Sequence, residues 1–250
     1  MNVKRRIMMI REVFSSIMGE GKFIGRRFIF VRFKGCPLDC VYCDEAKKVE
    51  GICEVENVPG TGNFEECPNI NEELINVINR LKTPDLFAVS FTGGEPLLYS
   101  DVIKEYSELL HDLGYKTFLE SNGMYPDKVN FFDYGSIDIK LPEHFKSKDV
   151  NQWRDLYKNE LKTIEKLHNM GSDVYAKIVV MEKTPESLVE DIAKDLSDIG
   201  DITLCIQPLT PYGTAKDVPS QEKIFNIMSL CGKYVDVMCT PQIHKIMGIL

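Results

Sequence analysis

Cys36-Pro-Leu-Asp-Cys40-Val-Tyr-Cys43 is the most informative stretch of this 250-residue chain. Three and then two residues separate its cysteines, and the stretch follows the apolar run Phe28–Phe33. Three neighbouring thiolates suit an iron–sulfur cluster or a zinc ion. The local ligand count is odd, because the next cysteine is Cys53 and the first histidine is His111. A four-iron cube held by three thiolates leaves one iron open to a non-protein ligand, so the stretch predicts a cluster that takes part in chemistry.

A structural zinc site is the alternative for the same three cysteines. Zinc takes four ligands, so a distant histidine such as His144 or His244 would have to complete the set. Further motifs along the chain favour the cluster.

The composition is that of an ordinary globular protein, with 44% hydrophobic and 27% charged residues. The net charge of −8 argues against non-specific binding to nucleic acid. No apolar run is long enough to cross a bilayer, and the segment Met1–Met9 is not a signal peptide. Eight cysteines without an export signal indicate a reducing cytoplasm and a metal rather than disulfides.

Apolar runs alternate with amphipathic segments along most of the chain. Strands are predicted over Phe28–Phe33, Leu86–Phe91, Thr117–Glu120, Ser136–Lys140, Val174–Met181, Ile202–Gln207 and Tyr234–Met238. Helices are predicted over Asn71–Leu81, from a Ser100 cap to Gly114, over Asn151–Met170, from Thr184-Pro185 onward, and from Ser220 to Gly232. This alternation implies a parallel sheet with right-handed crossovers. About six such units are too few for a closed eight-stranded barrel, so we expect an α/β fold of the partial parallel β/α barrel type, with an open doubly wound sheet as the alternative.

The domain organisation is expected to be simple. We predict a single domain over residues 1–250, interrupted by an irregular insertion at about 47–68 that is rich in glycine and proline. Cys53 and Cys67 lie in this insertion, and two local thiols are more consistent with unpaired cysteines than with a second cluster.

Unusual polar residues follow the predicted strands one after another. Cys36–Cys43 follows the first strand, Thr92–Pro96 the second and Glu120–Gly123 the third, while Asp138–Lys140 and Gln207-Pro208 end two later strands. Because the carboxyl ends of parallel strands meet at one edge of a sheet, we expect all five segments to line one site.

The cysteine spacing and Gly93-Gly94-Glu95-Pro96 resemble the radical S-adenosylmethionine (SAM) enzymes. The resemblance implies that SAM chelates the open iron of a [4Fe-4S] cluster and that the glycine motif holds its amino group. Glu120 and Asp138 could bond the ribose or the methionine moiety, and Gln207 could bond the adenine. For Glu120 and Asp138 the alternative is a helix cap or a surface carboxylate, and for Gln207 it is a satisfied polar residue at a strand end.

Both ends of the chain carry further signatures. The segment Phe14–Gly21 reads Phe-Ser-Ser-Ile-Met-Gly-Glu-Gly, and the segment from Pro241 to Leu250 contains Gln-Ile-His-Lys. Arg32, just before the cysteines, could grip a carboxylate through two parallel hydrogen bonds, or could form a structural ion pair. Together these segments resemble the 7-carboxy-7-deazaguanine synthases, and the matches run from about Glu12 to Leu250.

This resemblance implies a ring contraction. A radical formed from SAM removes a hydrogen from 6-carboxy-5,6,7,8-tetrahydropterin, ammonia leaves, and 7-carboxy-7-deazaguanine forms while SAM is regenerated. Magnesium assists by binding the substrate carboxylate. A flavodoxin or ferredoxin as reductant and a homodimer are implied in the same way. The rivals are a radical SAM glycyl-radical activase and a non-catalytic iron–sulfur or zinc protein.

The resemblance also assigns the site residues. Those expected to act catalytically are Glu20, Arg32 and His244. Those expected to contact the substrate are Ile17, Met18, Gly19, Arg32, Thr92 and Leu250. Those expected to line the SAM site are Tyr42, Cys43, Asp44, Gly93, Gly94, Glu95, Glu120, Asp138, Ile139, Lys140, Gln207, Pro208, Leu209 and Thr210. The expected metal ligands are Cys36, Cys40 and Cys43 for the cluster and Glu45 for magnesium.

Three positions depart from the family pattern. Met18 stands in place of a glutamine, which removes one side-chain contact with substrate. Glu45 replaces a threonine that helps to hold magnesium, although a carboxylate is also a hard oxygen ligand. Asp138 stands where many relatives carry serine, so a charge faces SAM instead of a hydroxyl.

Overall fold

A computed structural model describes residues 9–43, 51–146 and 150–250 of the chain. Within these ranges ten strands form one sheet in the order β10-β9-β8-β7-β6-β5-β2-β1-β3-β4. The strands are β1 (Ile10–Ile17), β2 (Arg27–Phe33), β3 (Cys53–Glu56), β4 (Phe64–Cys67), β5 (Leu86–Gly93), β6 (Thr117–Ser121), β7 (Tyr134–Asp138), β8 (Asp173–Val180), β9 (Thr203–Pro208) and β10 (Val237–Cys239). The helices are α2 (Ile70–Leu81), α3 (Ser100–Asp112), α4 (Val150–Asn169), α5 (Glu186–Ile199), α6 (Gln221–Cys231) and α7 (Ile243–Met247).

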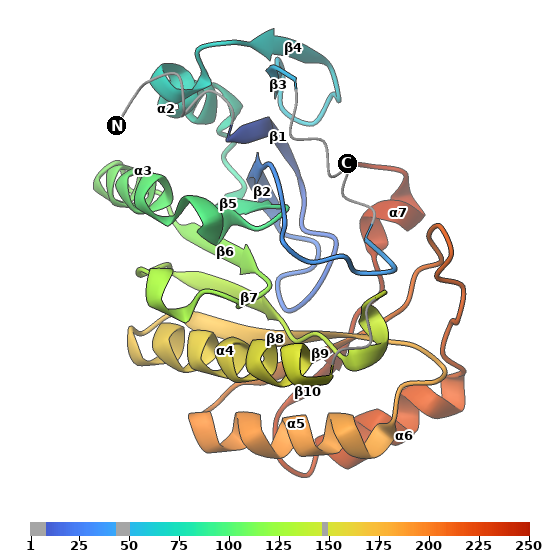
Figure 1. The fold of residues 1–250 in the computed structure, drawn as a ribbon. Coiled ribbons are helices and arrows are strands. Elements are labelled where there is room, and N and C mark those ends of the chain that lie inside the picture. The colour runs from blue at the N-terminus through green and yellow to red at the C-terminus, as the bar shows by residue number, and fades with distance from the viewer. Residues whose placement is uncertain (1–8, 44–50, 147–149) are drawn as a thin grey trace.

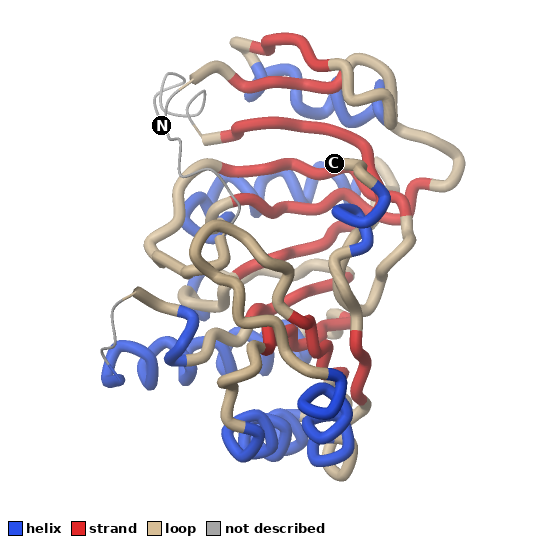
Figure 2. The backbone as a smooth tube through the Cα atoms, turned by 90° about the vertical axis from the view of Figure 1, so that its right-hand side faces the viewer, coloured by secondary structure: helices blue, strands red, loops and turns tan. Residues whose placement is uncertain are grey.

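The seven strands from β2 through β5, β6, β7, β8 and β9 to β10 pair in parallel, which confirms the predicted partial β/α barrel. They are the seven strands predicted from the sequence, with boundaries that shift by up to three residues. Figure 1 shows α4, α5 and α6 along one face of the curved sheet. Figure 2 shows the C-terminal segment in front of the strands in the upper half of the view, with helices behind these strands.

The sequence analysis missed an N-terminal extension of the sheet. Strand β1 pairs antiparallel with β2, and β3 and β4 form a hairpin inside the insertion that was expected to be irregular. Glu56, the last residue of β3, is buried and accepts hydrogen bonds from Ser15 N (2.9 Å) and Gly62 N (2.8 Å). In the sequence, a charged residue such as Glu56 resembles a loop residue, although here it satisfies buried backbone groups. The prediction of an irregular insertion was therefore wrong at β3 and β4.

Helix starts differ slightly from the predicted caps. Helix α2 begins one residue before the predicted Asn71, with Asn69 at the N-cap, and α3 already includes Ser100. The prediction for Ser220 is confirmed, because its hydroxyl accepts a hydrogen bond from Lys223 N at the start of α6. None of the helices in the described ranges combines the length and apolar character that a bilayer crossing requires.

Aromatic side chains fill the interior at the amino ends of the parallel strands. Phe23, from the loop after β1, packs with ring centroids 4.9 Å from Tyr134 and 6.0 Å from Phe118. Phe28 and Tyr175 are fully buried in the same cluster. This packing closes the partial barrel at the amino ends of its strands, so the open interior lies at their carboxyl ends.

Candidate active site

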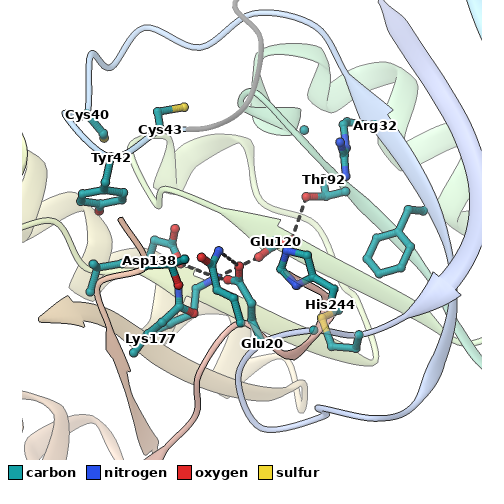
Figure 3. Close-up of a pocket in the computed structure, with 18 of the residues that line it drawn as sticks. Glu20, Arg32, Cys40, Tyr42, Cys43, Thr92, Glu120, Asp138, Lys177 and His244 are labelled. Carbon is teal, nitrogen blue, oxygen red and sulfur yellow. Dashed lines mark hydrogen bonds and ion pairs between the residues drawn. The ribbon is translucent and has the colours of Figure 1, made fainter. Parts of the chain in front are cut away.

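A cavity of about 440 Å³ opens at the carboxyl ends of the parallel strands (Figure 3). It brings together most of the residues that were predicted from the sequence: Ile17, Met18, Gly19, Glu20, Arg32, Cys36, Cys40, Tyr42, Cys43, Thr92, Gly93, Gly94, Glu120, Asp138, Lys140, Gln207, Leu209, Thr210, His244 and Leu250. Three predicted residues, Glu95, Ile139 and Pro208, do not line it. Asp44 and Glu45 lie outside the described residues.

The cysteine loop forms one wall of this cavity. Val41 N donates to His144 O at 2.8 Å, and Cys40 pairs with Phe145 in an isolated β-bridge. Asn122 Nδ2 lies 3.7 Å from Cys36 Sγ. Burial raises the pKa of Cys36 and Cys40, so both thiols need a strong positive partner to ionise. A metal centre is such a partner, because a coordinating thiol is deprotonated outright.

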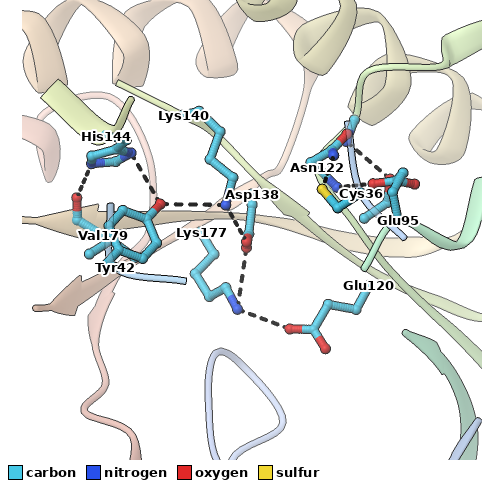
Figure 4. A network of polar contacts seen from close by, with 12 residues as sticks. Cys36, Tyr42, Glu95, Glu120, Asn122, Asp138, Lys140, His144, Lys177 and Val179 are labelled. Carbon is cyan, nitrogen blue, oxygen red and sulfur yellow. Dashed lines mark hydrogen bonds and ion pairs between the residues drawn. The ribbon is translucent and has the colours of Figure 1, made fainter. Parts of the chain in front are cut away.

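The two histidines proposed for a zinc site lie in different surroundings. His144 Nε2 donates to Val179 O (2.8 Å), which leaves Nδ1 as an acceptor for Leu141 N (3.0 Å) and Tyr42 OH (3.2 Å) (Figure 4). Burial and the nearby charge of Lys140 lower the pKa of His144 to about 3, so the ring is neutral. His244, which lies in the C-terminal segment, packs against Gly19. Both ring nitrogens of His144 are hydrogen-bonded, so this ring is not free to complete a zinc site, and the three neighbouring cysteines suit a cluster held by three thiolates.

The Gly-Gly-Glu turn is built around the entry to the cysteine loop. Gly94 N donates to Phe33 O (3.0 Å), Glu95 N donates to Gly35 O (2.8 Å), and a Cβ on Gly94 would lie 2.0 Å from Gly35 O. The glycines thus allow two stretches of backbone to meet. The Glu95 carboxylate is fully buried and accepts hydrogen bonds from Leu97 N, Ser121 Oγ and Asn122 N at 2.8–2.9 Å. A contact of Glu95 with a cofactor stays a prediction.

Four predicted site residues form a cluster of charged side chains with Lys177, a residue that the sequence analysis missed. The ammonium of Lys177 lies 2.5 Å from Glu20, 3.0 Å from Glu120 and 3.2 Å from Asp138. Lys140 contacts Asp138 at 2.8 Å. Against the effect of burial, the two lysines lower the pKa of Asp138 to about 2, and the carboxylates hold the pKa of both lysines above its usual value. Three carboxylates and two ammonium groups give this cluster a net charge of −1, which favours a cationic ligand.

One more wall combines a guanidinium with stacked aromatic rings. Arg32 forms a 2.8 Å ion pair with Glu12, and its guanidinium lies 5.1 Å from the ring centroid of Phe14. The rings of Phe14 and Phe30 are stacked at 5.2 Å with 17° between their planes. Thr92 Oγ1 donates to Glu120 Oε2 at 2.8 Å (Figure 3). This wall offers a flat apolar surface beside a guanidinium whose charge is paired with Glu12.

The two ends of the described chain meet at the cavity. Ile243 N donates to Gly19 O at 3.0 Å, and Gln242 Nε2 donates to Glu20 at 2.5 Å. Ser16 Oγ donates to Leu250 O at 2.6 Å. Gln242, Lys177 and Phe14 were not predicted as site residues. Phe14 and Gln242 lie in the two terminal signature segments, and Lys177 is a lone lysine in the apolar run Val174–Met181, where a lysine is rarely buried without a partner.

Comparisons with known proteins agree with this geometry. The model of the radical SAM superfamily matches residues 30–196. A 7-carboxy-7-deazaguanine synthase of Methanocaldococcus jannaschii is 62% identical over 245 residues, which cover 97% of this chain and all of that protein. The chain belongs to the 7-carboxy-7-deazaguanine synthase family. A second synthase, from Methanothermobacter thermautotrophicus, is 38% identical over 96% of this chain and 97% of that protein.

Solved structures support the fold of this synthase-family chain. QueE from Escherichia coli superposes with a TM-score of 0.58 at 18% identity, over 95% of this chain and 96% of that one. SuiB from Streptococcus suis, bound to S-adenosylmethionine, gives 0.56 at 11% identity, over 82% of this chain and 48% of that one. The family consists of radical SAM lyases, and membership implies a [4Fe-4S] cluster and SAM as cofactors.

Proposed function

We propose that the protein contracts 6-carboxy-5,6,7,8-tetrahydropterin to 7-carboxy-7-deazaguanine, with loss of ammonia, as a step of 7-deazapurine biosynthesis. The strongest support for this proposal is that residues from both ends of the described chain line one cavity together with the three cysteines. A radical SAM enzyme acting on a large protein would need that edge open to a partner. Here Gln242 and Ile243 are hydrogen-bonded to the Gly19-Glu20 segment and narrow the cavity to the scale of a small molecule.

The substrate half of the cavity suits a flat, carboxylated ring. In the proposed complex the pterin lies along Phe14 and Phe30 while Arg32 receives the carboxylate in a bidentate pair. Thr92, together with the backbone of Ile17, Met18 and Gly19, orients the ring, and His244 and Leu250 close the pocket. Glu20 is held by Gln242 and Lys177 at a place where it can bond a ring N–H.

The cofactor half lies between the cysteine loop and the carboxyl ends of β6–β9. When bound, SAM at the cluster supplies the radical that abstracts hydrogen from the substrate. The protein's part is to orient it: Glu120 and Asp138 accept from its hydroxyl or amino groups, Tyr42 covers the adenine, and Gln207 bonds the adenine edge. Gln207 Oε1 is buried and has no hydrogen-bond partner among the described residues, as expected of a group that awaits a ligand.

Further parts of the proposal rest on family resemblance. Magnesium binds the substrate carboxylate, with Glu45 as its candidate protein ligand. A flavodoxin or ferredoxin supplies the electron, the protein works as a homodimer in the cytoplasm, and residues 1–250 form a single radical SAM domain. The continuous sheet over the described ranges supports the last point.

The test is anaerobic reconstitution with iron and sulfide, followed by assay with SAM, reductant, magnesium and the carboxylated tetrahydropterin. We expect 7-carboxy-7-deazaguanine by mass spectrometry and no net consumption of SAM. SAM cleavage without this product from the pterin would instead favour a glycyl-radical activase. Absence of SAM binding by the reconstituted protein would favour a non-catalytic metal protein.

A further inference from the structure

Lys177 occupies an unusual position in the cavity. It lies on β8, its side chain is only 4% exposed, and its ammonium contacts carboxylates from three separate segments. These are Glu20 in the loop after β1, Glu120 on β6 and Asp138 at the end of β7. Among the described residues, it is the one group that bonds all three.

Each of the three carboxylates also has a second partner, and these partners belong to different halves of the cavity. Glu20 accepts from Gln242 of the C-terminal segment, on the substrate side. Asp138 accepts from Lys140, on the cofactor side. Glu120 accepts from Thr92, between the two halves. The Lys177 ammonium therefore joins the two sides through direct contacts (Figure 4 shows its contacts with Glu120 and Asp138).

Removing the ammonium would leave three carboxylates around an uncharged space. The net charge of the cluster would change from −1 to −2. The carboxylates of Glu20 and Asp138 would then repel each other, with no positive charge between them. Because buried unpaired charges are costly, the carboxylates would move apart or take up protons. Either response changes the distance between a group that faces the substrate and groups that face the cofactor.

We propose that Lys177 is a positioning residue that fixes the substrate-side carboxylate relative to the cofactor-side carboxylates, and thereby couples SAM cleavage to hydrogen abstraction from the substrate. This inference rests on the proposed function. Its role is geometric: the reacting atoms must lie within about 3–3.5 Å of each other for efficient transfer. With a misplaced substrate, the 5′-deoxyadenosyl group would take its hydrogen atom from a C–H or S–H donor of the buffer. Each such event would consume one electron from the reductant and release 5′-deoxyadenosine and methionine, so SAM would not be regenerated.

The test compares Lys177→Met with Lys22→Met in the reconstituted holoenzyme. Lys22 is a matched control, because it lies in the same N-terminal loop as Glu20 but pairs with Asp173 at the surface, at 2.6 Å. We expect Lys177→Met to raise the ratio of 5′-deoxyadenosine to product by about 10- to 100-fold, while Lys22→Met leaves the ratio unchanged. Equal losses of SAM cleavage and product in Lys177→Met would overturn the proposal.

A second variant guards against a folding defect. Lys177→Arg keeps the charge, so the carboxylates stay compensated, but its longer planar group holds them at other distances. We expect the same rise in the ratio, smaller in size, with SAM affinity retained in calorimetric titration. A wild-type ratio in Lys177→Arg would overturn the geometric role. If the unaltered enzyme makes no 7-carboxy-7-deazaguanine, the proposed function fails independently, since that result does not depend on Lys177.

Discussion

The imidazole of His244 occupies the space that a side chain on Gly19 would fill. A Cβ on Gly19 would lie 1.9 Å from His244 Nδ1 and 2.9 Å from His244 Cβ. Gly19 does not have a positive φ, so its lack of a side chain serves packing rather than backbone conformation. The N-terminal and C-terminal signatures of the sequence are therefore two halves of one contact.

Gly19→Ala should displace His244 and lower kcat/KM for the pterin by roughly 10- to 100-fold. In the proposed complex His244 closes the substrate pocket, and a shift of about 1 Å at a group that positions substrate is enough for such a loss. Steady-state kinetics on Gly19→Ala, His244→Ala and the double variant check this. The double variant should be no worse than His244→Ala alone, since the methyl group then has room. Losses that simply add would show that Gly19 acts without His244.

Arg32→Ala should weaken pterin binding by about 100-fold or more, because each hydrogen bond between charged groups contributes roughly 1.5–3 kcal/mol and the proposed pair has two. Reductive SAM cleavage should persist, because Arg32 lies against Phe14 and Glu12, on the wall of the cavity that we propose for the substrate. Substrate titration by fluorescence measures the affinity, with Arg32→Lys as an intermediate case that keeps the charge but loses the planar fork. Unchanged affinity in Arg32→Ala would refute this role.

The sequence predicted the parallel half of the fold and most of the cavity for one physical reason. Parallel strands place their carboxyl ends at one edge, so motifs separated by 50 or more residues, such as the cysteine loop and Gly93-Gly94, converge without any knowledge of loops. Each strand was also apolar enough to stand out. The place of His244 at the substrate pocket was predicted through family resemblance, because no local pattern places His244 at Gly19.

Strand β1 and the role of Lys177 were not predicted, because both depend on partners that are distant along the chain. Strand β1 contains Ser15 and Ser16, so it lacks simple alternation, yet both are buried because β1 lies between β2 and β3. Lys177 is a single lysine in an apolar strand, and its three carboxylates come from elsewhere. Such ion pairs follow from tertiary contacts, which a local pattern does not contain.

Cys40→Ala should abolish the cluster and turnover together, because two thiolates cannot hold the cube. Iron content, the visible absorption of the cluster and the electron paramagnetic resonance signal of the reduced protein check the loss. The control is a double variant, Cys53→Ala with Cys67→Ala, on the paired strands β3 and β4. It should keep the full iron content, and a loss of iron there would revive the hypothesis of a second cluster.

Acid should destabilise the protein through His144. Its pKa falls from 6.5 to about 3 in the folded protein, so between these values the unfolded chain binds a proton that the folded chain does not. Stability therefore decreases as pH falls below 6.5, by about 1.4 kcal/mol per pH unit from this group alone. Urea unfolding at pH 7.5, 6.0 and 5.0 measures the slope against His144→Gln, which does not titrate. Equal slopes in the two proteins would contradict a neutral buried ring.

Gln207→Leu should affect cofactor affinity and stability in opposite directions. The Gln207 side chain is buried, and its Oε1 has no hydrogen-bond partner among the described residues. Replacing an unsatisfied polar group by an apolar one of similar shape should stabilise the cofactor-free protein, by up to about 1 kcal/mol. The same change removes the proposed bond to adenine, so SAM affinity should fall by about 3- to 10-fold. Thermal unfolding of the cofactor-free protein and calorimetric titration of the reconstituted protein measure the two effects.

The exposed Gln221 at the start of α6 supplies the control, and Gln221→Leu should change neither quantity appreciably. The opposite signs separate two roles for Gln207. A structural role predicts that stability falls in Gln207→Leu, because a side chain that supports the folded protein is lost. A binding role predicts a gain in stability with a loss in affinity, because the buried Oε1 has no hydrogen-bond partner among the described residues and the adenine would supply one. A fall in stability with unchanged SAM affinity would remove Gln207 from the cofactor site.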